Sequence, residues 1–355
     1  MMGHPTLRWG VIGTGLISSW FVGDLVLPRE DKSAKHIIQA IGSSSKQKAE
    51  DFIRKFAPES TAATYGTYDA VYADPEVDIV YIGTPHAFHK QACLDAIAHG
   101  KHVLCEKPFT LNRREATEVF DAARKQGVFI MEALWTRFTP LCQKLQKVVH
   151  EEQLIGEVHR VFCDFGLQFD LESLPSSSRL KNVALGGGSL LDMGIYPITW
   201  GLLLLDDQIG EKAATPHVFS AQTISEEIDI ATSMLLHYPE SGRQGILTSS
   251  MKTKSDPIFA RIEGSKGVIT IEGPGTSMPS KFTLYPRDND SGRKEYAFSH
   301  PGYGFYYEAD AVAQDIAADK TQNSVMPWDE TLRVLELMDG VRERGGARFP
   351  QDHVV

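Results

Sequence analysis

Short apolar runs alternate with helical patterns of apolar and polar residues through the first 130 residues. The strand-like runs cover residues 7–12, 36–41, 77–82, 102–105 and 128–131, and the helical patterns cover residues 16–27, 46–56, 87–99 and 113–125. This alternation is typical of a parallel sheet with helices on both faces. We therefore predict a doubly wound α/β domain, a Rossmann domain, over residues 1–133.

The pattern changes after residue 134. One helical stretch (140–152) precedes eight strand-like segments without helices between them, and two helical patterns (306–318 and 329–344) end the chain. The strand-like segments are residues 157–169, 217–224, 230–237, 245–251, 259–263, 268–272, 282–285 and 295–298. Strands grouped apart from helices predict an α+β domain with a largely antiparallel sheet, which we assign to residues 134–355.

Length and charge narrow the class of protein. A chain of 355 residues is long enough for two domains. The 36 basic and 46 acidic side chains give a formal net charge of −10, which argues against broad binding to nucleic acid or to an anionic membrane. The longest apolar stretch, 195–205, is interrupted by Pro197 and falls short of the roughly 18 residues that span a membrane. The N-terminus has no signal-like pattern, so we expect a cytoplasmic protein.

The cysteines and histidines give no metal signal. Cys93, Cys105, Cys142 and Cys163 are too far apart in sequence for a zinc site or a dense disulfide framework, and we expect buried free thiols. His86 and His89 have no matching carboxylate or third histidine nearby. We therefore predict no bound metal.

A glycine-rich segment follows the first predicted strand and opens the first predicted helix. Gly13 permits a tight turn, and Gly15 lets backbone amides approach a pyrophosphate at the helix N-terminus. Ser18 replaces the third glycine and is still small. The position of this segment in a βαβ pattern predicts dinucleotide binding by Gly13, Thr14, Gly15, Leu16 and Ile17.

The end of the second predicted strand carries hydroxyls and lysines where NAD-binding domains carry a carboxylate. Residues 42–48 read GSSSKQK. Ser43, Ser44, Ser45 and Lys48 can receive a 2′-phosphate, which a carboxylate would repel, so the segment favours NADP. A helix cap beside solvated lysines is the alternative, and the sequence leaves it open.

Glu106-Lys107-Pro108 follows the predicted strand 102–105 directly. Ligands of open α/β sheets bind at the carboxyl ends of the strands. Pro108 restricts the backbone after Lys107, and Glu106 supplies a neighbouring carboxylate, so the Lys107 ammonium is expected beside a nicotinamide. A surface turn is the alternative.

Several motifs together resemble the Gfo/Idh/MocA oxidoreductase family, and most closely its branch of dimeric dihydrodiol dehydrogenases and NADP-dependent D-xylose dehydrogenases. They are the glycine-rich segment, Thr84-Pro85-His86 with His89, Glu106-Lys107-Pro108, and the segments 131–138 (MEALWTRF), 186–197 (GGGSLLDMGIYP) and 302–309 (GYGFYYEA). The resemblance implies a Rossmann domain, a second domain with an open-faced sheet, a homodimer formed through that sheet, and NADP-dependent oxidation of a sugar or cyclic diol.

The resemblance also implies roles for single residues. Lys107, Tyr196 and Asp192 would be catalytic, with Tyr196 taking a hydroxyl proton. A tyrosine ordinarily has a pKa near 10, and an adjacent ammonium favours its phenolate. Thr84, Pro85, His86, His89 and Glu106 would lie beside the cofactor. Trp135, Arg137, Phe138 and Arg179 are candidate substrate contacts, with core packing of the aromatics and surface positions for the arginines as the alternative.

Two other functions remain open at this point. The galactose repressor of yeast has a similar fold and binds a dinucleotide as a regulator, and some glycosidases use a tightly held nicotinamide transiently. Intact Lys107, Asp192 and Tyr196 favour an enzyme over a regulator. The sequence does not distinguish a sugar substrate from a dihydrodiol.

Overall fold

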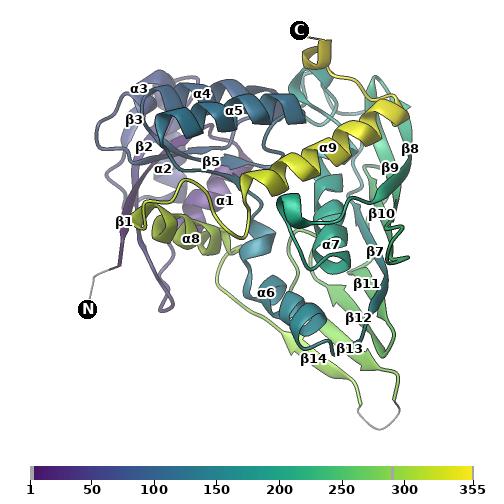
Figure 1. Cartoon of the computed structure of the whole chain (residues 1–355). Helices are drawn as coiled ribbons and strands as arrows, with labels where there is room; N and C mark the ends of the chain where they lie inside the picture. Colours follow the sequence, from purple (N-terminus) through teal and green to yellow (C-terminus); the bar gives the residue numbers. More distant parts are fainter. Residues whose placement is uncertain (1–3, 289–291, 354–355) are drawn as a thin grey trace. The chain divides into compact units, whose positions relative to one another are not determined.

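A computed structural model describes residues 4–288 and 292–353 of the chain (Figure 1). The chain divides into two compact units. The first comprises Met1–Thr110, Arg114–Phe138 and His300–Trp328, and the second comprises Leu111–Arg113, Thr139–Ser299 and Asp329–Val355. The expectation of no leader sequence rests partly on residues 1–3, which lie outside the described residues.

The first unit is built on a six-stranded parallel sheet, which confirms the predicted Rossmann domain. The strand order is β3-β2-β1-β4-β5-β6. The strands are β1 (Thr6–Ile12), β2 (Lys35–Gly42), β3 (Ala63–Tyr65), β4 (Ile79–Ile82), β5 (His102–Glu106) and β6 (Ile130–Ala133). The short edge strand β3 was not expected, because it has only three residues and all are half-buried.

The helices of this unit follow the predicted pattern closely. They are α1 (Leu16–Leu25), α2 (Lys46–Phe56), α3 (Asp69–Tyr72), α4 (His89–Ala98), α5 (Arg113–Gln126) and α8 (Phe305–Ala317), with 3-10 turns at η1 (His86–Phe88) and η2 (Trp135–Phe138). The Ser45 hydroxyl accepts the Lys48 N–H and fixes the start of α2. Helix α3 is a single turn and was not expected.

The structure divides the chain differently from the expected boundary, because His300–Trp328 returns to the first unit. The buried carboxylate of Asp24, near the end of α1, accepts backbone N–H groups of Tyr303, Gly304 and Phe305 at 2.6–3.0 Å. Helix α8 then packs beside α1. These are contacts between segments 280 residues apart, and no local pattern in the sequence indicates them.

The second unit contains an eight-stranded sheet in the order β14-β13-β12-β11-β7-β10-β9-β8. The strands are β7 (Val158–Gly166), β8 (His217–Ser225), β9 (Ile228–His237), β10 (Gln244–Ser250), β11 (Ile258–Gly264), β12 (Gly267–Glu272), β13 (Lys281–Pro286) and β14 (Lys294–Ala297). Among the described strands of this sheet, only β7 and β10 pair in parallel, so the predicted α+β fold with a largely antiparallel sheet is confirmed.

One face of this sheet is covered by helix α7 (Ile195–Leu205), which packs on β7 and β10 and is buried along its whole length. Helix α6 (Pro140–Gln146), the π-helices η3 (Lys147–Glu151) and η5 (Leu190–Gly194), and helix α9 (Trp328–Gly345) are further helical elements; α9 begins at the unit boundary. The short turns η4 (Val183–Leu185), η6 (Gly210–Lys212) and η7 (Pro350–His353) complete the described helical elements.

The stretch Val183–Leu205, which contains η5 and α7, is long and apolar enough to cross a membrane by length and composition. The apolar stretch expected from the sequence was only 195–205, interrupted by Pro197. In the structure, 94% of the apolar window is buried within the protein. Packing in the core therefore accounts for its composition.

The sheet face opposite α7 carries a row of apolar side chains that crosses four strands. Phe219 pairs with Leu235, Leu235 with Ile246, and Ile246 with Phe162. Phe219 is 59% exposed and the other three are half-buried. The row is partly exposed, in keeping with the open face that the resemblance implied, and the charged side chains of Arg160, Arg261 and Glu263 lie beside it.

Candidate active site

The glycine-rich segment forms the turn between β1 and α1. Gly13 has a φ of +83°, and a Cβ there would lie 2.8 Å from the carbonyl oxygen of Gly83. Ser18 is fully buried against Gly83, where a Cβ would come within 2.1 Å of its hydroxyl oxygen. The small residues at 13, 18 and 83 thus let the helix, the turn and the end of β4 approach closely.

The start of α1 has the properties of an anion site. A Cβ placed on Gly15 would meet no atom within 4 Å, so the space beside the first turn is open. No side chain caps the helix at Gly15, and the first turn contains no acidic residue. Open backbone amides and a helix N-terminus fit a pyrophosphate group.

The serines after β2 lie where the sequence analysis expected a ribose-phosphate contact. The Thr14 and Ser43 hydroxyls are 2.8 Å apart, which joins the glycine turn to the end of β2. The exposed Lys48 ammonium donates to the Ser44 hydroxyl at 2.9 Å. Ser45 caps α2, so the cap alternative holds for that residue while Ser44 and Lys48 present a hydroxyl and a cation to solvent. These residues fit a cofactor with a 2′-phosphate.

The loop carrying Lys107 is held from several sides. The buried Glu106 carboxylate accepts the Tyr81 hydroxyl at 2.6 Å and the Lys107 N–H at 3.2 Å. The Lys107–Pro108 peptide is cis, and the Phe109 N–H donates to the Glu132 carboxylate on β6 at 2.9 Å. Lys107 itself is half-buried at the carboxyl end of β5.

His89 has a different place from the one expected of a cofactor contact. It is fully buried, with Nδ1 2.9 Å from the Pro108 carbonyl oxygen and Nε2 2.8 Å from the Thr84 carbonyl oxygen. Both carbonyl oxygens accept, so a ring nitrogen contributes to each contact only as a donor, and which nitrogen donates depends on the tautomer. Burial lowers the pKa of the His89 ring, and the hydrogen bonds to the Thr84 and Pro108 carbonyls oppose that shift. His89 therefore holds the Lys107 loop against the turn after β4 and presents no surface to a ligand.

Glu308 on α8 is a functional-site neighbour that the sequence analysis missed. Its carboxyl is fully buried, and neither oxygen has a hydrogen-bond partner among the described residues. Burial, reinforced by the charge of Glu106, raises the pKa of Glu308 well above its usual range. Glu106 receives donors from Tyr81 and Lys107, whereas Glu308 receives none, so Glu308 is the carboxyl of this pair that keeps its proton.

Replacing this acid by its neutral isostere is expected to stabilise the protein. The folded state binds the Glu308 proton more tightly than the unfolded chain, so stability is lost as pH rises above the ordinary value of 4.5 toward the folded pKa. Glu308→Gln removes that loss. We expect a Tm at least about 2 °C above that of the native protein at pH 8, with the difference vanishing near pH 4.5.

Scanning calorimetry at several pH values checks this expectation. Glu59→Gln, at an exposed position, is the control and leaves Tm unchanged. A native-like or lower Tm for Glu308→Gln at pH 8 would contradict the assignment of the proton to Glu308.

The glycine run leads into the helices that carry Asp192 and Tyr196. Gly186 and Gly188 have φ values of +78° and +127°, which a residue with a side chain rarely adopts. Asp192 lies on η5, and its Oδ1 accepts from the Arg179 guanidinium at 3.1 Å. Tyr196 lies in the first turn of α7 with 4% of its surface exposed. Arg179 thus lies beside Asp192 with 51% of its side chain exposed, which agrees with the alternative of a surface position.

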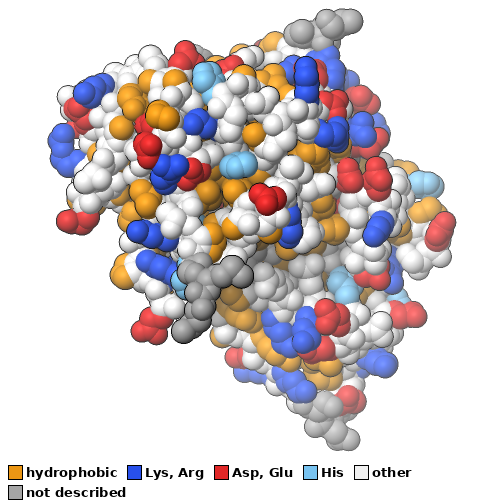
Figure 2. All heavy atoms as spheres, turned by 60° about the vertical axis from the view of Figure 1, so that its left-hand side comes forward, with side chains coloured by type: hydrophobic (Ala, Val, Ile, Leu, Met, Phe, Trp, Pro, Cys, Tyr) orange, Lys and Arg blue, Asp and Glu red, His pale blue; other side chains and the backbone are white. Residues whose placement is uncertain are grey.

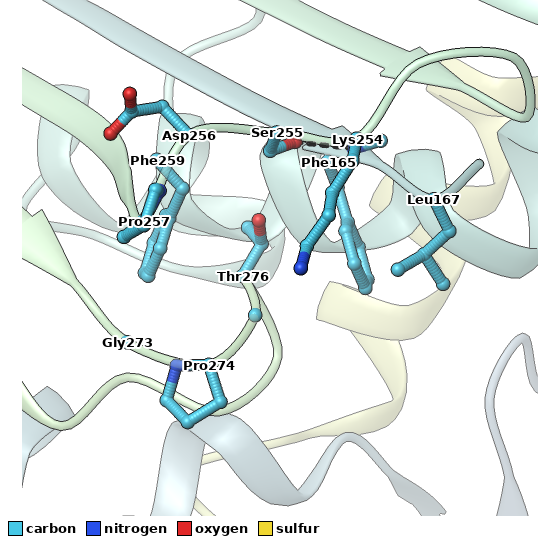
Figure 3. A pocket seen from close by; sticks show the side chains of 12 residues that line it. Phe165, Leu167, Lys254, Ser255, Asp256, Pro257, Phe259, Gly273, Pro274 and Thr276 are labelled. Atoms are coloured by element: carbon cyan, nitrogen blue, oxygen red, sulfur yellow. Dashed lines mark hydrogen bonds between the residues drawn. The ribbon is translucent and has the colours of Figure 1, made fainter.

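The second unit contains a hollow that is lined in part by Phe165. The Phe165 ring stands edge-on to the Tyr196 ring, with 5.5 Å between the ring centroids. The hollow contains about 500 Å³ of empty space, part of it open to solvent. Figure 3 shows Lys254 beside Phe165, with Pro257 and Phe259 to one side and Leu167 to the other. The lining is completed by Gly166, Ser255, Asp256, Gly273, Pro274, Gly275 and Thr276. No motif or spacing in the sequence indicates this hollow.

The candidate substrate contacts on η2 are packed in the structure. Trp135 stacks on Phe305 with 4.6 Å between ring centroids, and Arg137 and Phe138 are also buried. Burial favours the packing alternative for the two aromatics. A surface position for Arg137 is excluded, because only 2% of it is exposed.

The described residues contain no group of three or more His, Cys, Asp or Glu side chains that could hold a metal ion. All four cysteines are free and buried. On the face shown in Figure 2, acidic and basic side chains are interspersed and do not segregate into a basic stripe.

Comparison with known proteins decides the family. Residues 7–134 match the model of the Gfo/Idh/MocA oxidoreductase family with its NAD-binding Rossmann fold, and residues 142–270 match the model of the Gfo/Idh/MocA C-terminal domain. The chain belongs to the Gfo/Idh/MocA oxidoreductase family. The family predicted from the motifs is thereby confirmed.

Two relatives within the Gfo/Idh/MocA family match nearly the whole chain. The D-xylose 1-dehydrogenase (NADP(+)) of Hypocrea jecorina is 33% identical, with 98% of this chain and 95% of the relative covered. The trans-1,2-dihydrobenzene-1,2-diol dehydrogenase of Sus scrofa is 33% identical, with 98% of this chain and 99% of the relative covered.

Solved structures share the Gfo/Idh/MocA fold at lower identity. KijD10, a 3-ketoreductase from Actinomadura kijaniata solved with NADP and TDP-benzene, gives a TM-score of 0.78 at 23% identity, covering 95% of this chain and 97% of that one. The aldose-aldose oxidoreductase of Caulobacter crescentus gives 0.78 at 22% identity with the same coverage.

Proposed function

We propose that the chain is an NADP-dependent dehydrogenase that oxidises a hydroxyl-bearing carbon of a sugar or of a cyclic trans-diol. The observation that carries the proposal is the Ser44–Lys48 pair at the carboxyl end of β2, in a segment without any carboxylate between Gly42 and Lys48. The relatives of about one-third identity, an NADP-dependent D-xylose dehydrogenase and dihydrodiol dehydrogenases, agree with this cofactor and substrate class.

The residues divide into those that hold the cofactor and those that handle the proton. The Gly13–Ile17 segment would hold the pyrophosphate, Ser44 and Lys48 the 2′-phosphate, and the Lys107 loop the nicotinamide end. NADP⁺, when bound, accepts a hydride from the substrate carbon. Tyr196 takes the proton of the same substrate hydroxyl, and the Lys107 ammonium favours the anionic form of the tyrosine. Lys107 lies in the first unit and Tyr196 in the second, and their pairing is a prediction.

The hollow beside Tyr196 is our candidate for the substrate pocket. The Phe165 and Phe259 rings offer apolar faces to a six-membered ring, and Lys254 offers a donor to its hydroxyls. This combination fits both a pyranose and a cyclic diol.

A spectrophotometric screen of NADP reduction tests the function. We expect turnover with at least one of D-xylose, glucose, galactose, myo-inositol and benzene dihydrodiol. A protein that binds NADP but reduces none of it would support a regulator. A protein that keeps its cofactor, reduces no added NADP and hydrolyses glycosides would support a glycosidase.

We also propose a homodimer that forms through the open face of the second unit's sheet. The row Phe219, Leu235, Ile246 and Phe162 is an apolar surface that association would cover. Sedimentation equilibrium should give about twice the chain mass of 39.3 kDa, and Leu235→Lys with Ile246→Lys should give the monomer. A native monomer over a wide concentration range would refute this proposal.

We further propose that the enzyme acts in the cytoplasm without nucleic-acid or membrane partners. The net charge of −10 and the interspersed charges on the face shown in Figure 2 support this proposal.

A further inference from the structure

The start of η5 is attached to the sheet at two neighbouring residues. The buried Ser189 hydroxyl donates to the Ser249 hydroxyl of β10 at 2.7 Å, and the Leu190 N–H donates to Oδ2 of Asp229 on β9 at 2.7 Å. Asp192 and Tyr196 follow within six residues of Leu190, on η5 and the first turn of α7. The position of both side chains therefore depends on how this start is held.

Asp229 is built into this attachment. It is 1% exposed, and the same Oδ2 also accepts the Thr232 hydroxyl at 2.8 Å. A Cβ on Gly188 would lie 2.3 Å from Oδ1 of Asp229. The carboxylate thus occupies the space that a side chain at position 188 would need, which explains the third glycine of the run.

We propose that Asp229 is a positioning residue for the proton-transfer step: its carboxylate fixes the start of η5 and, through that helix, the places of Asp192 and Tyr196. This inference rests on the proposed function, in which Tyr196 takes the substrate proton. Asp229 itself is too deeply buried to touch a substrate.

The ionisation of Asp229 gives the attachment a pH dependence. Burial raises the pKa of Asp229 to about 7. The hydrogen bonds that its carboxylate accepts from Thr232, Leu190 and its own amide lower the pKa, as does the positive charge of Arg342 on α9, but burial outweighs them. Arg342 is itself paired with Asp339 and Asp352. Among the neighbouring elements, η5 contributes Asp192, β10 has no titratable side chain, and β8 contributes Gln222, which donates to Thr232.

Activity and stability should therefore respond to pH in opposite directions. The anionic carboxylate holds the Leu190 N–H more strongly than the neutral acid does, so the attachment tightens as pH rises through about 7. The folded-state pKa is raised above the ordinary 3.8, so the contribution of Asp229 to stability falls as pH rises from 3.8 to about 7.

Asp229→Asn tests the proposal through its pH profile. In the native enzyme kcat should fall below a pH of about 7, the pKa of Asp229. In Asp229→Asn the inflection near pH 7 should disappear and leave only the rise of kcat with pH that deprotonation of Tyr196 gives. In this variant kcat above pH 8 should be about 10- to 100-fold lower, and the Kd of NADP should change by less than about twofold. Thr232→Val removes a donor to the anion and should move the inflection to higher pH.

Asp206→Asn is the matched control, because Asp206 is another buried aspartate of this unit that accepts backbone N–H groups, from Gln208 and Ala214. It should keep the native inflection. An unchanged inflection and native kcat in Asp229→Asn, with circular dichroism showing a native fold, would overturn the proposal. If Asp229→Asn does not fold, a Thr232→Val variant in which kcat falls at the same pH as in the native enzyme would also overturn the proposal.

Hydrogen exchange separates this proposal from the proposed function. If no substrate is found, the positioning role still predicts that protection factors of the Leu190–Gly194 amides rise through pH 7 in the native protein and stay flat in Asp229→Asn. Equal protection in both proteins would overturn the proposal whatever the substrate is.

Discussion

Tyr196→Phe is expected to lose turnover by about 10²- to 10⁴-fold while binding NADP as the native enzyme does. The change removes one hydroxyl, the group assigned to take the substrate proton, and leaves the Gly13–Ile17 segment and Lys48 untouched. Cofactor affinity is measured by fluorescence titration and turnover by absorbance of NADPH. Near-native turnover in a folded variant that binds NADP would place the acid/base elsewhere, with Asp192 the next residue to test.

Lys107→Met is expected to be at least as harmful and to affect binding as well. It removes both the charge that favours the anionic tyrosine and a contact expected at the nicotinamide end of the cofactor. Lys252→Met, which removes an exposed lysine of the other unit, is the control for loss of a positive charge. A Lys107→Met variant with native turnover would remove Lys107 from the proposed mechanism.

Ser44→Asp is expected to lower kcat/KM for NADP by at least about tenfold, which corresponds to about 1.4 kcal/mol, with no comparable loss for NAD. The new carboxylate would repel a 2′-phosphate and pair with the Lys48 ammonium, which now donates to Ser44. Lys48→Ala should also lower kcat/KM for NADP.

Lys46→Ala is the matched control for the cofactor experiment. Lys46 is an exposed lysine of the same helix whose ammonium lies 3.8 Å from Glu50. Its loss should leave the preference between the cofactors unchanged. A native enzyme that uses NAD as efficiently as NADP would favour the alternative in which serine caps the start of α2 and the neighbouring lysines are solvated.

Local patterns in the sequence predicted the elements that local chemistry determines. The turn at Gly13 and the capped start of α2 at Ser45 follow from residue types within a few positions of each other. The position of His89 did not follow, because a histidine at a helix start has the same local pattern whether it faces a ligand or two carbonyl groups. Only the folding of the Lys107 loop onto α4 decides between these.

Asp229 was also not predicted from the sequence. In the sequence it interrupts an apolar strand pattern, between Ile228 and Ile230, and a charged residue in such a place is the signal that could have singled it out. Its partner at Gly188 lies about 40 positions earlier, so no spacing rule joins the two. Glu308 was not predicted for the same reason, because its burial depends on a segment that returns to the first unit from the far end of the chain.

The return of His300–Trp328 to the first unit has a consequence for how the chain is made. During synthesis, the cofactor-binding unit lacks α8 and the partners of Asp24 until more than 300 residues have left the ribosome. The second unit's sheet, β7 to β14, is by then already synthesised. A fragment ending at residue 133 would expose the α1 surface that α8 covers, so the nucleotide-binding module cannot be excised by cutting the chain once.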